Sequence, residues 1–416
     1  MIKISEPWIE NDEQDAYLKA KIEIPSEATK VWKEFANKSH YYTYIKENYK
    51  LEDNYIIIWY KVKKNLEKYL CEDRNDAFLV AILYYAMITG QDIECGKKIS
   101  DKLLFNLNYI LIPTLCNEQT GFKRIYIKAD TTNKIYNEEK KVATGMSNGI
   151  DSLYTLHSLK EKYINRNYKL NALTFINAGA SHYFPKLPKE IDMTEINEKA
   201  NELHRKKCDK AREIAKIEKL DLVEIHSNIS DLYQGVFGLT HIYRNLSCIL
   251  AMQKFFGKYY YSSAGLKIDE YKPSLLEDGG HMELMLIPIL STENLEFICG
   301  GESRTRYMKT KELTEDAIAQ NYLNVCGKDE NCANCAKCYR TILTLEQLGK
   351  LESFKNVFNL NNYNRTRAYF WLLNNKDTDE FASEIYSNIK NKKIIPLKSR
   401  LLSLIYKMLK KLRIKK

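Results

Sequence analysis

A hexad of small and polar residues at 147–152, with the sequence SNGIDS, has the composition of a phosphate-binding loop. Its small residues let the backbone approach an anion closely, and the hydroxyls of Ser147 and Ser152 can donate to phosphate oxygens. A helical run follows at 153–159, and the first N–H groups of that helix would point at the same anion. The carboxylate of Asp151 would repel a polyphosphate unless a Mg²⁺ ion lay between them. The hexad therefore predicts a site for a magnesium-bound nucleotide.

Four cysteines within thirteen residues form the second chemical feature of the chain. Cys332, Cys335 and Cys338 make two overlapping C-x-x-C steps, and Cys326, six positions earlier, can close a tetrahedron around Zn²⁺. A redox dithiol, disulfides and an iron–sulfur cluster are the competing interpretations. Tetrathiolate zinc explains the spacing most simply in a chain whose N-terminus shows no secretion signal. No fifth ligand is implied, so we expect a structural rather than a catalytic metal site.

The hexad resembles the SGGxDS loop of the N-type ATP pyrophosphatases, the PP-loop superfamily, which includes 7-cyano-7-deazaguanine synthase, the asparagine synthetase domain and the tRNA thiolases. Asn148 stands where the family usually has glycine. Asparagine is the residue that best tolerates left-handed backbone after glycine, so we expect the turn to survive. Taken alone, the hexad could also be an ordinary loop before a helix. A pyrophosphate loop followed by a late cysteine knuckle, however, resembles the arrangement in 7-cyano-7-deazaguanine synthase.

The resemblance covers roughly residues 76–350 and is to a broader group of synthase-like proteins found among polysaccharide and natural-product genes. It implies an α/β fold with a doubly wound, mainly parallel sheet of the HUP, or adenine nucleotide alpha hydrolase-like, kind. It also implies ATP, Mg²⁺ and Zn²⁺ as cofactors. The chain of 416 residues is much longer than a deazaguanine synthase, which argues against simple identity of function.

The elements that must position the hexad are predicted by the hydrophobic pattern from residue 142 onward, where strands alternate with helices. The expected strands are 142–146, 172–176, 222–225 and 259–262, and the expected helices after the hexad helix are 195–219 and 241–256. This alternation predicts a mainly parallel sheet. Ligands of such sheets bind beyond the carboxyl ends of the strands, where the hexad and the segment 177–179 would both lie. In the resembling family the second segment flanks the adenine, which implies nucleotide-binding positions at Phe175, Asn177 and Gly179.

The residues before this region predict a mixed α+β module, an accessory or substrate domain at 1–135. Its expected elements are a strand at 18–24, a helix from Ser26, a strand at 55–59, a helix at 77–88 ended by Gly90, and a strand at 124–128. The charged, turn-rich segment 130–141 is the best domain boundary. A PP-loop domain with the zinc knuckle at 326–338 would occupy 136–350, followed by a helical extension at 351–416.

Several polar residues between the hexad and the cysteines are candidates for binding or catalysis. Arg304 or Arg306 could hold a phosphate or a carboxylate through a planar fork of donors, and each could equally be a surface arginine. Lys309 could neutralise leaving pyrophosphate. The turn residue Ser303 is a substrate-binding candidate. The catalytic candidates are therefore Asp151, Ser152, Arg304 and Lys309.

A glycine-rich segment at 279–283 would let a ligand come close to the backbone. We predict that His281 and Glu283 contact the substrate, with a simple loop histidine as the alternative for His281. The other six histidines are expected to have core or surface roles.

The net charge of +10 lies wholly in the tail. Residues 391–416 carry ten Lys or Arg and no acid, so the remaining 54 basic and 54 acidic residues cancel. An enzyme that clamps a whole tRNA would show a basic body, so nucleic-acid binding is disfavoured. The sequence shows neither a signal peptide nor an apolar run of about 18 residues, and we expect a cytoplasmic protein.

The tail itself has an apolar stripe at helical spacing with basic residues around it. The stripe consists of Leu401, Leu402, Leu404, Ile405, Met408, Leu409 and Leu412. Such a helix could lie on an anionic membrane surface, dock on the body or a partner with its charged face in solvent, or make nonspecific RNA contacts.

The resemblance implies an ATP-dependent synthase that adenylates a carboxylate or carbonyl oxygen, releases pyrophosphate and lets ammonia or an amine displace AMP. Ser147, Asn148, Gly149, Asp151 and Ser152 would hold the nucleotide. The substrate would be a small molecule or a sugar derivative. Two alternatives stay open: a sulfur-transfer enzyme of the same fold, which needs a reactive cysteine, and a catalytically weak nucleotide-binding protein, which Asn148 would explain.

Overall fold

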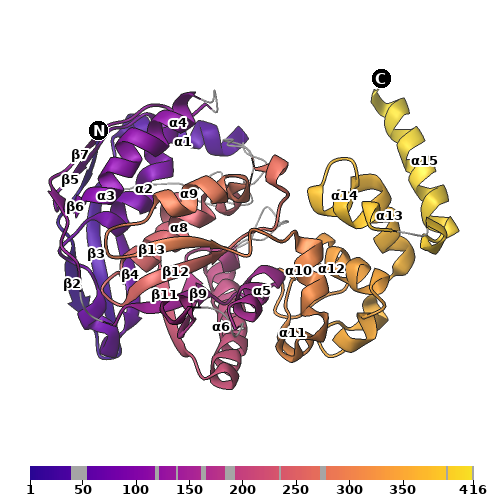
Figure 1. Ribbon diagram of the computed structural model, residues 1–416. Helices are drawn as coiled ribbons and strands as arrows, with labels where there is room; N and C mark the ends of the chain where they lie inside the picture. The colour runs from indigo at the N-terminus through magenta and orange to yellow at the C-terminus, as the bar shows by residue number, and fades with distance from the viewer. Residues whose placement is uncertain are drawn as a thin grey trace. The chain divides into compact units, whose positions relative to one another are not determined.

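The computed structural model describes residues 1–38, 54–117, 121–136, 139–160, 165–182, 193–233, 236–271, 278–389 and 392–414 (Figure 1). The chain divides into two compact units. The first unit comprises Met1–Met146, Leu159–Ser263 and Ile268–Gly300, and the second comprises Ser147–Ser158, Ala264–Lys267 and Gly301–Lys416. Each unit is described by itself.

Eleven strands among the described residues form the central sheet of the first unit. Their order is β13-β12-β9-β10-β11-β4-β3-β1-β5-β7, with β2 paired to β3. The bounds are β1 Ile2–Ile4, β2 Trp8–Asn11, β3 Asp15–Glu23, β4 Tyr55–Lys63, β5 Ile93–Cys95, β7 Ile127–Lys128, β9 Lys141–Gly145, β10 Ala172–Asn177, β11 Asp221–Ser227, β12 Phe256–Ser262 and β13 Glu296–Gly300. A separate pair joins β6 Ile99–Ser100 to β8 Thr131–Thr132.

Two parts of this sheet differ in strand direction and in burial. The strands from β13 to β11 pair in parallel, and β10 is almost continuously buried, as strands covered on both faces are. In contrast, β3 alternates buried and partly exposed residues and pairs antiparallel with β4. The prediction of an α/β protein with a mainly parallel sheet is therefore confirmed at this level.

The order of the parallel strands reverses beside β9. From β9 the chain proceeds through β10 and β11 on one side, and then returns to place β12 and β13 on the other side. In open α/β sheets, ligands bind at the carboxyl ends of the strands where such a reversal occurs. Only Met146 separates the end of β9 from the hexad in the sequence.

Helices cover the sheet of the first unit. α6 (Met193–Glu218) contacts β10 and β11, whereas α2 (Asp76–Thr89) packs against α8 (Phe237–Leu250). Figure 1 shows α6 and α8 on opposite faces of the parallel strands. Every residue of α2 is buried, and between Asp76 and Thr89 its residues are apolar or aromatic on all sides of the helix, as expected for a helix in the core. The remaining helices are α1 Ser26–Lys38, α3 Asp101–Phe105, α4 Ile112–Asn117, α7 Ile229–Tyr233 and α9 Glu283–Ile289.

Most of the elements expected from the sequence are present, with shifted ends. Gly90 ends α2 as predicted: it is left-handed, with φ at 71°, and its N–H donates to the carbonyl of Ala86. The strand expected at 124–128 is only β7. The helix expected at 241–256 is α8, which ends at Leu250 because β12 already begins at Phe256.

The predicted domain boundary near residue 135 does not coincide with a boundary between the two units. β4 pairs with β11, so the sheet continues from the N-terminal strands into the parallel strands. The predicted extension at 351–416 belongs to a unit that also includes the hexad and Gly301–Lys416.

The second unit is helical in the residues that the structure describes. Its helices are α5 Ile150–Ser158, α10 Arg306–Glu312, α11 Ala317–Tyr322, α12 Ala336–Gln347, α13 Arg365–Asn375, α14 Glu380–Ser387 and α15 Leu397–Ile414. A small core of buried side chains from α12, α13 and α14, including Leu343, Leu372 and Ile385, holds them together. Among the described helices of the whole chain, none is long and apolar enough to span a bilayer.

Candidate functional site

The hexad forms a tight turn that leads directly into α5. Asn148 is left-handed, with φ at 64°, as predicted for this substitute of glycine. Its backbone carbonyl accepts a hydrogen bond of 2.7 Å from the N–H of Asn324. The N–H of Leu153 donates to the carbonyl of Gly149 at 3.0 Å and so begins the helix. The first-turn N–H groups of α5 therefore follow the turn immediately.

The two hydroxyls of the hexad lie close together. Ser147 donates to Ser152 over 3.2 Å, and Ser152 donates to the carbonyl of Gly149 over 3.1 Å. Ser147 is exposed and Ser152 is buried. Ser147 is thus the hydroxyl that a ligand in solvent can reach, and it would exchange its contact with Ser152 for one with the ligand.

Asp151 is paired with two cations. Its Oδ2 accepts from a guanidinium nitrogen of Arg306, and its Oδ1 lies 3.5 Å from Nζ of Lys309. Lys309 is fully buried, with its ammonium over the ring of Tyr154 at 5.8 Å from the ring centre. The local sum of charge is therefore positive, so a Mg²⁺ ion is not needed merely to offset Asp151. A net positive charge of this kind would favour a nearby anion even without a metal.

Of the two candidate arginines, Arg306 is the one that reaches the hexad. Arg304 forms a 2.6 Å ion pair with Glu312, and the other carboxylate oxygen of Glu312 accepts from the hydroxyl of Tyr154. Arg304 therefore orients α5 through Glu312 and Tyr154. Ser303, predicted to contact a substrate, is exposed.

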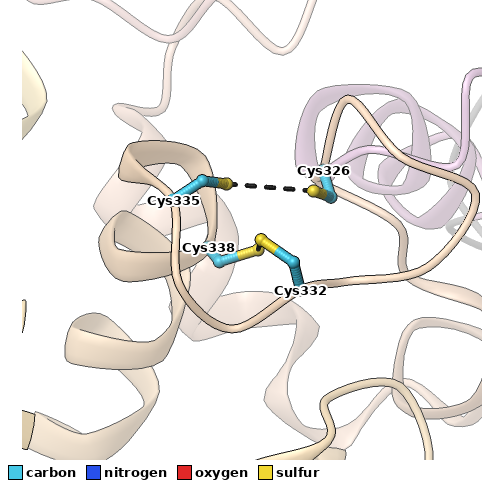
Figure 2. A group of neighbouring side chains, drawn as sticks. All are labelled: Cys326, Cys332, Cys335 and Cys338. Atoms are coloured by element: carbon cyan, nitrogen blue, oxygen red, sulfur yellow. Dashed lines mark hydrogen bonds between the residues drawn. The ribbon is translucent and has the colours of Figure 1, made fainter. Parts of the chain in front are cut away.

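The four cysteines come together as predicted (Figure 2). Their sulfur atoms all lie within 4.8 Å of one another, with 3.8 Å between Cys326 and Cys335 and 3.9 Å between Cys332 and Cys338. A zinc tetrahedron with bonds of about 2.3 Å has sulfur atoms about 3.8 Å apart. Disulfides would need about 2.05 Å. The four thiols thus fit a metal ion such as Zn²⁺.

The backbone around the cysteines is held in place by Asn331. Its Oδ1 accepts from the N–H groups of Val325 and Cys326, and its Nδ2 donates to the carbonyl of Leu323 at 2.8 Å. The next residue, Asn324, makes the backbone hydrogen bond to Asn148. The segment that carries the first cysteine is therefore joined directly to the hexad turn.

The residues predicted to flank an adenine belong to the first unit. The ring of Phe175 lies 4.9 Å from that of His204, and Nδ2 of Asn177 lies 3.4 Å from Nδ1 of His226. Both residues are near the carboxyl end of β10, as expected.

Gly179 has a local reason to be glycine. Its φ is 104°, and a Cβ there would come within 2.5 Å of a guanidinium nitrogen of Arg244. Arg244 is 1% exposed and donates to Thr240 and to the carbonyl of Ala178. The sequence analysis missed Arg244, although a lone arginine inside the apolar run of α8 is a usable signal of a buried contact.

His226 gives the first unit a pH-dependent stability. Burial, followed by the nearby charge of Lys61, lowers the pKa of His226 to about 4. Because the unfolded histidine has a pKa of about 6.5, the unfolded chain takes up the proton first as the pH falls, and stability is lost between about pH 6.5 and 4. We expect the unfolding free energy of the natural protein to fall from pH 7 to 5 by about 2 kcal/mol more than that of His226→Gln. Denaturant titration checks this, and equal losses in both proteins would contradict it.

The glycine-rich segment contains a network that the sequence analysis did not anticipate. The ring nitrogens of His241 lie 2.6 Å from the hydroxyl of Tyr261 and 3.2 Å from a carboxylate oxygen of Asp278. That same oxygen accepts from the N–H of Gly280. His241 was predicted to be an ordinary core or surface histidine, and residues so distant in sequence offer no local signal of this contact.

Two of the three predicted substrate residues lie beside this network in the chain. Nδ1 of His281 lies 3.1 Å from the carbonyl of Asp278. Glu283 is 1% exposed, and its carboxylate accepts from the hydroxyl of Tyr271. In this structure, therefore, Glu283 faces the protein interior.

Comparisons of the chain with protein-family models, with curated proteins and with solved structures find no match.

Proposed function

We propose that the chain is an ATP-dependent synthase of the pyrophosphatase kind. It binds Mg-ATP at the hexad, transfers the AMP group to a carboxylate or carbonyl oxygen of a small molecule or sugar derivative, and releases pyrophosphate. Ammonia or an amine then displaces AMP and forms a C–N bond. The observation that carries the proposal is the hexad turn at the start of α5, with the cations of Arg306 and Lys309 beside it.

The chemistry of the hexad supports this reaction. A carboxylate oxygen is a poor leaving group and AMP is a good one, so adenylation prepares the carbonyl for attack. Negative charge grows on pyrophosphate as it leaves, and fixed N–H groups and cations stabilise that charge best. Helix α5 supplies the N–H groups, and Lys309 and Arg306 supply the cations. Mg²⁺ arrives with the nucleotide and adds to this stabilisation.

The order of the parallel strands is also favourable. The hexad follows β9, the strand beside which the order reverses, and this is the topology of sheets that bind nucleotides at the ends of their strands.

Sulfur transfer is less well supported. Such an enzyme needs a cysteine that is readily deprotonated. Burial raises the pKa of Cys71, Cys95 and Cys208 to about 12 in each case, and it also raises the pKa of Cys116 and Cys248. Five of the six single cysteines are therefore harder to deprotonate than a free thiol.

The direct test is the fate of ATP. We expect the protein, given Mg-ATP and a small-molecule extract of the source cells, to form AMP and pyrophosphate. Asp151→Asn removes the charge that aligns Arg306 and Lys309, and we expect it to lower the rate of AMP formation at least about 100-fold. Chromatographic separation of AMP from ADP measures the reaction. The matched control is Asp130→Asn, an exposed aspartate outside the hexad, which should behave like the natural protein.

The other possible outcomes would favour a different function. ADP in place of AMP contradicts the proposal. Intact ATP, together with a measurable ATP affinity that Asp151→Asn weakens, would favour a binding protein without turnover.

A further inference from the structure

The last helix, α15, docks on the second unit with its polar face. Ser399 and Ser403 are 0% and 5% exposed. The hydroxyl of Ser399 donates to the carbonyl of Thr366 at 2.9 Å, and that of Ser403 donates to Oδ1 of Asn374 at 3.1 Å. Both partners belong to α13. A stripe of serines is therefore the face by which α15 is attached.

Apart from Tyr406, the apolar side chains of α15 between Leu397 and Leu409 are exposed and lie outside this contact. An ordinary surface helix buries its apolar stripe and exposes its polar face. In α15 the serine face is buried and the apolar stripe is exposed. Its exposed apolar side chains are Leu397, Leu401, Leu402, Leu404, Ile405, Met408 and Leu409, between 41% and 70% exposed. The ring of Tyr406 instead contacts that of Phe370 on α13, with 5.8 Å between the ring centres. Figure 1 shows the C-terminal part of α15 standing clear of α13. A contiguous apolar surface of this kind marks an interaction site.

The charge around this surface has one sign. Residues 391–416 contain ten basic residues and no acid, and Lys407, Lys410 and Lys411 are exposed on α15. An apolar face with basic residues beside it is complementary to a lipid bilayer, which has an apolar interior and can have anionic headgroups. A second copy of α15 would bring like charges together, which opposes self-association through this face.

We propose that α15 binds the surface of an anionic lipid bilayer. The helix, roughly 27 Å long at 1.5 Å per residue, lies in the plane of the membrane. Its leucines enter the boundary between headgroups and acyl chains to a depth of about 5–10 Å. Lys407, Lys410 and Lys411 contact the anionic headgroups, and the serine face keeps the helix on α13.

Vesicle sedimentation of the full chain tests the proposal. Vesicles of phosphatidylcholine alone are compared with vesicles containing about one third phosphatidylserine. We expect binding to the anionic vesicles, weakened by salt because the attraction is screened within about 10 Å at 0.1 M. The double variant Leu401→Ser with Ile405→Ser should bind the anionic vesicles about 10-fold to 100-fold more weakly than the natural protein. Lys407→Gln, Lys410→Gln and Lys411→Gln together should weaken it roughly 100-fold.

A matched control removes the same amount of exposed apolar surface elsewhere. Ile135 and Ile217 are each 52% exposed, as Leu401 is, and Ile135→Ser with Ile217→Ser should leave vesicle binding unchanged. Because all these side chains are exposed, the variants should melt like the natural protein.

The other outcomes overturn the proposal. Absence of binding to anionic vesicles does so, and equal binding to both kinds of vesicle shows that the charges have no part. Self-association that depends on Leu401 and Ile405, without vesicle binding, would assign the face to a second copy. Capture of an acidic protein in place of lipid would assign it to a protein partner.

Discussion

Replacing Cys335 with serine is expected to release zinc from the second unit and to unfold the segment around it. The four sulfur atoms are spaced for a tetrahedral ion, and a structural zinc contributes about 10 kcal/mol or more to folding. Loss of one thiolate removes most of this free energy, which is comparable to the whole stability of a typical domain. Elemental analysis of the purified proteins should find about one zinc per natural chain and much less in Cys335→Ser.

The loss should extend from the cysteines to the hexad. Asn324, two residues before Cys326, donates its N–H to the carbonyl of Asn148. Without the metal this segment has less to hold it, so hydrogen exchange should accelerate in α12 and at Asn324, and ATP affinity should fall. A strong chelator should reproduce both effects in the natural protein.

Cys116→Ser is the matched control for Cys335→Ser. Cys116 is a partly exposed single cysteine outside the cluster, so its replacement should retain zinc and melt like the natural protein. A natural protein that is purified without metal, or a Cys335→Ser variant that melts unchanged, would contradict a structural zinc site.

The sequence was sufficient for features that depend on local pattern. The cysteine spacing predicted the cluster because sulfurs three residues apart on one turn have little choice of position. The alternation of strands with helices after residue 142 predicted that the strands at 172–176 and 259–262 are parallel, because parallel neighbours are joined by a crossover that is usually a helix. The left-handed turn at Asn148 was expected because this residue stands where the resembling loop has glycine and because asparagine tolerates a positive φ.

Features that depend on contacts between distant elements were not predictable. Arg304 and Arg306 differ by two positions, and only the start of α10, capped by Thr305, decides that Arg306 reaches Asp151. The pairing of β4 with β11 places the N-terminal strands and the parallel strands in one sheet, whereas the sequence pattern had predicted two separate domains at 1–135 and 136–350. The apolar stripe of α15 was recognised, but the face by which it docks depends on its serines meeting α13.

Replacing Lys309 with methionine should nearly abolish the formation of AMP. Methionine fills a similar volume but carries no charge, and Lys309 is the fully buried cation beside Asp151. Loss of a single group that stabilises charge in a transition state typically slows a reaction by about 10²–10³. The variant should also be less stable, by about 2 kcal/mol. This loss is smaller than the roughly 3–5 kcal/mol that breaking a buried ion pair costs, because Asp151 retains its ion pair with Arg306.

The comparison of rate with affinity decides what Lys309 does. A cation that acts on departing pyrophosphate binds the transition state more strongly than ATP, so the turnover of bound ATP should fall far more than the ATP affinity. Lys311→Met, on the same helix but exposed, should leave both quantities unchanged. If Lys309→Met instead lost affinity alone, the lysine would only hold the nucleotide. If it lost neither while remaining folded, the positive group beside Asp151 would be structural, and the proposed reaction would have no cation at the leaving group except Arg306.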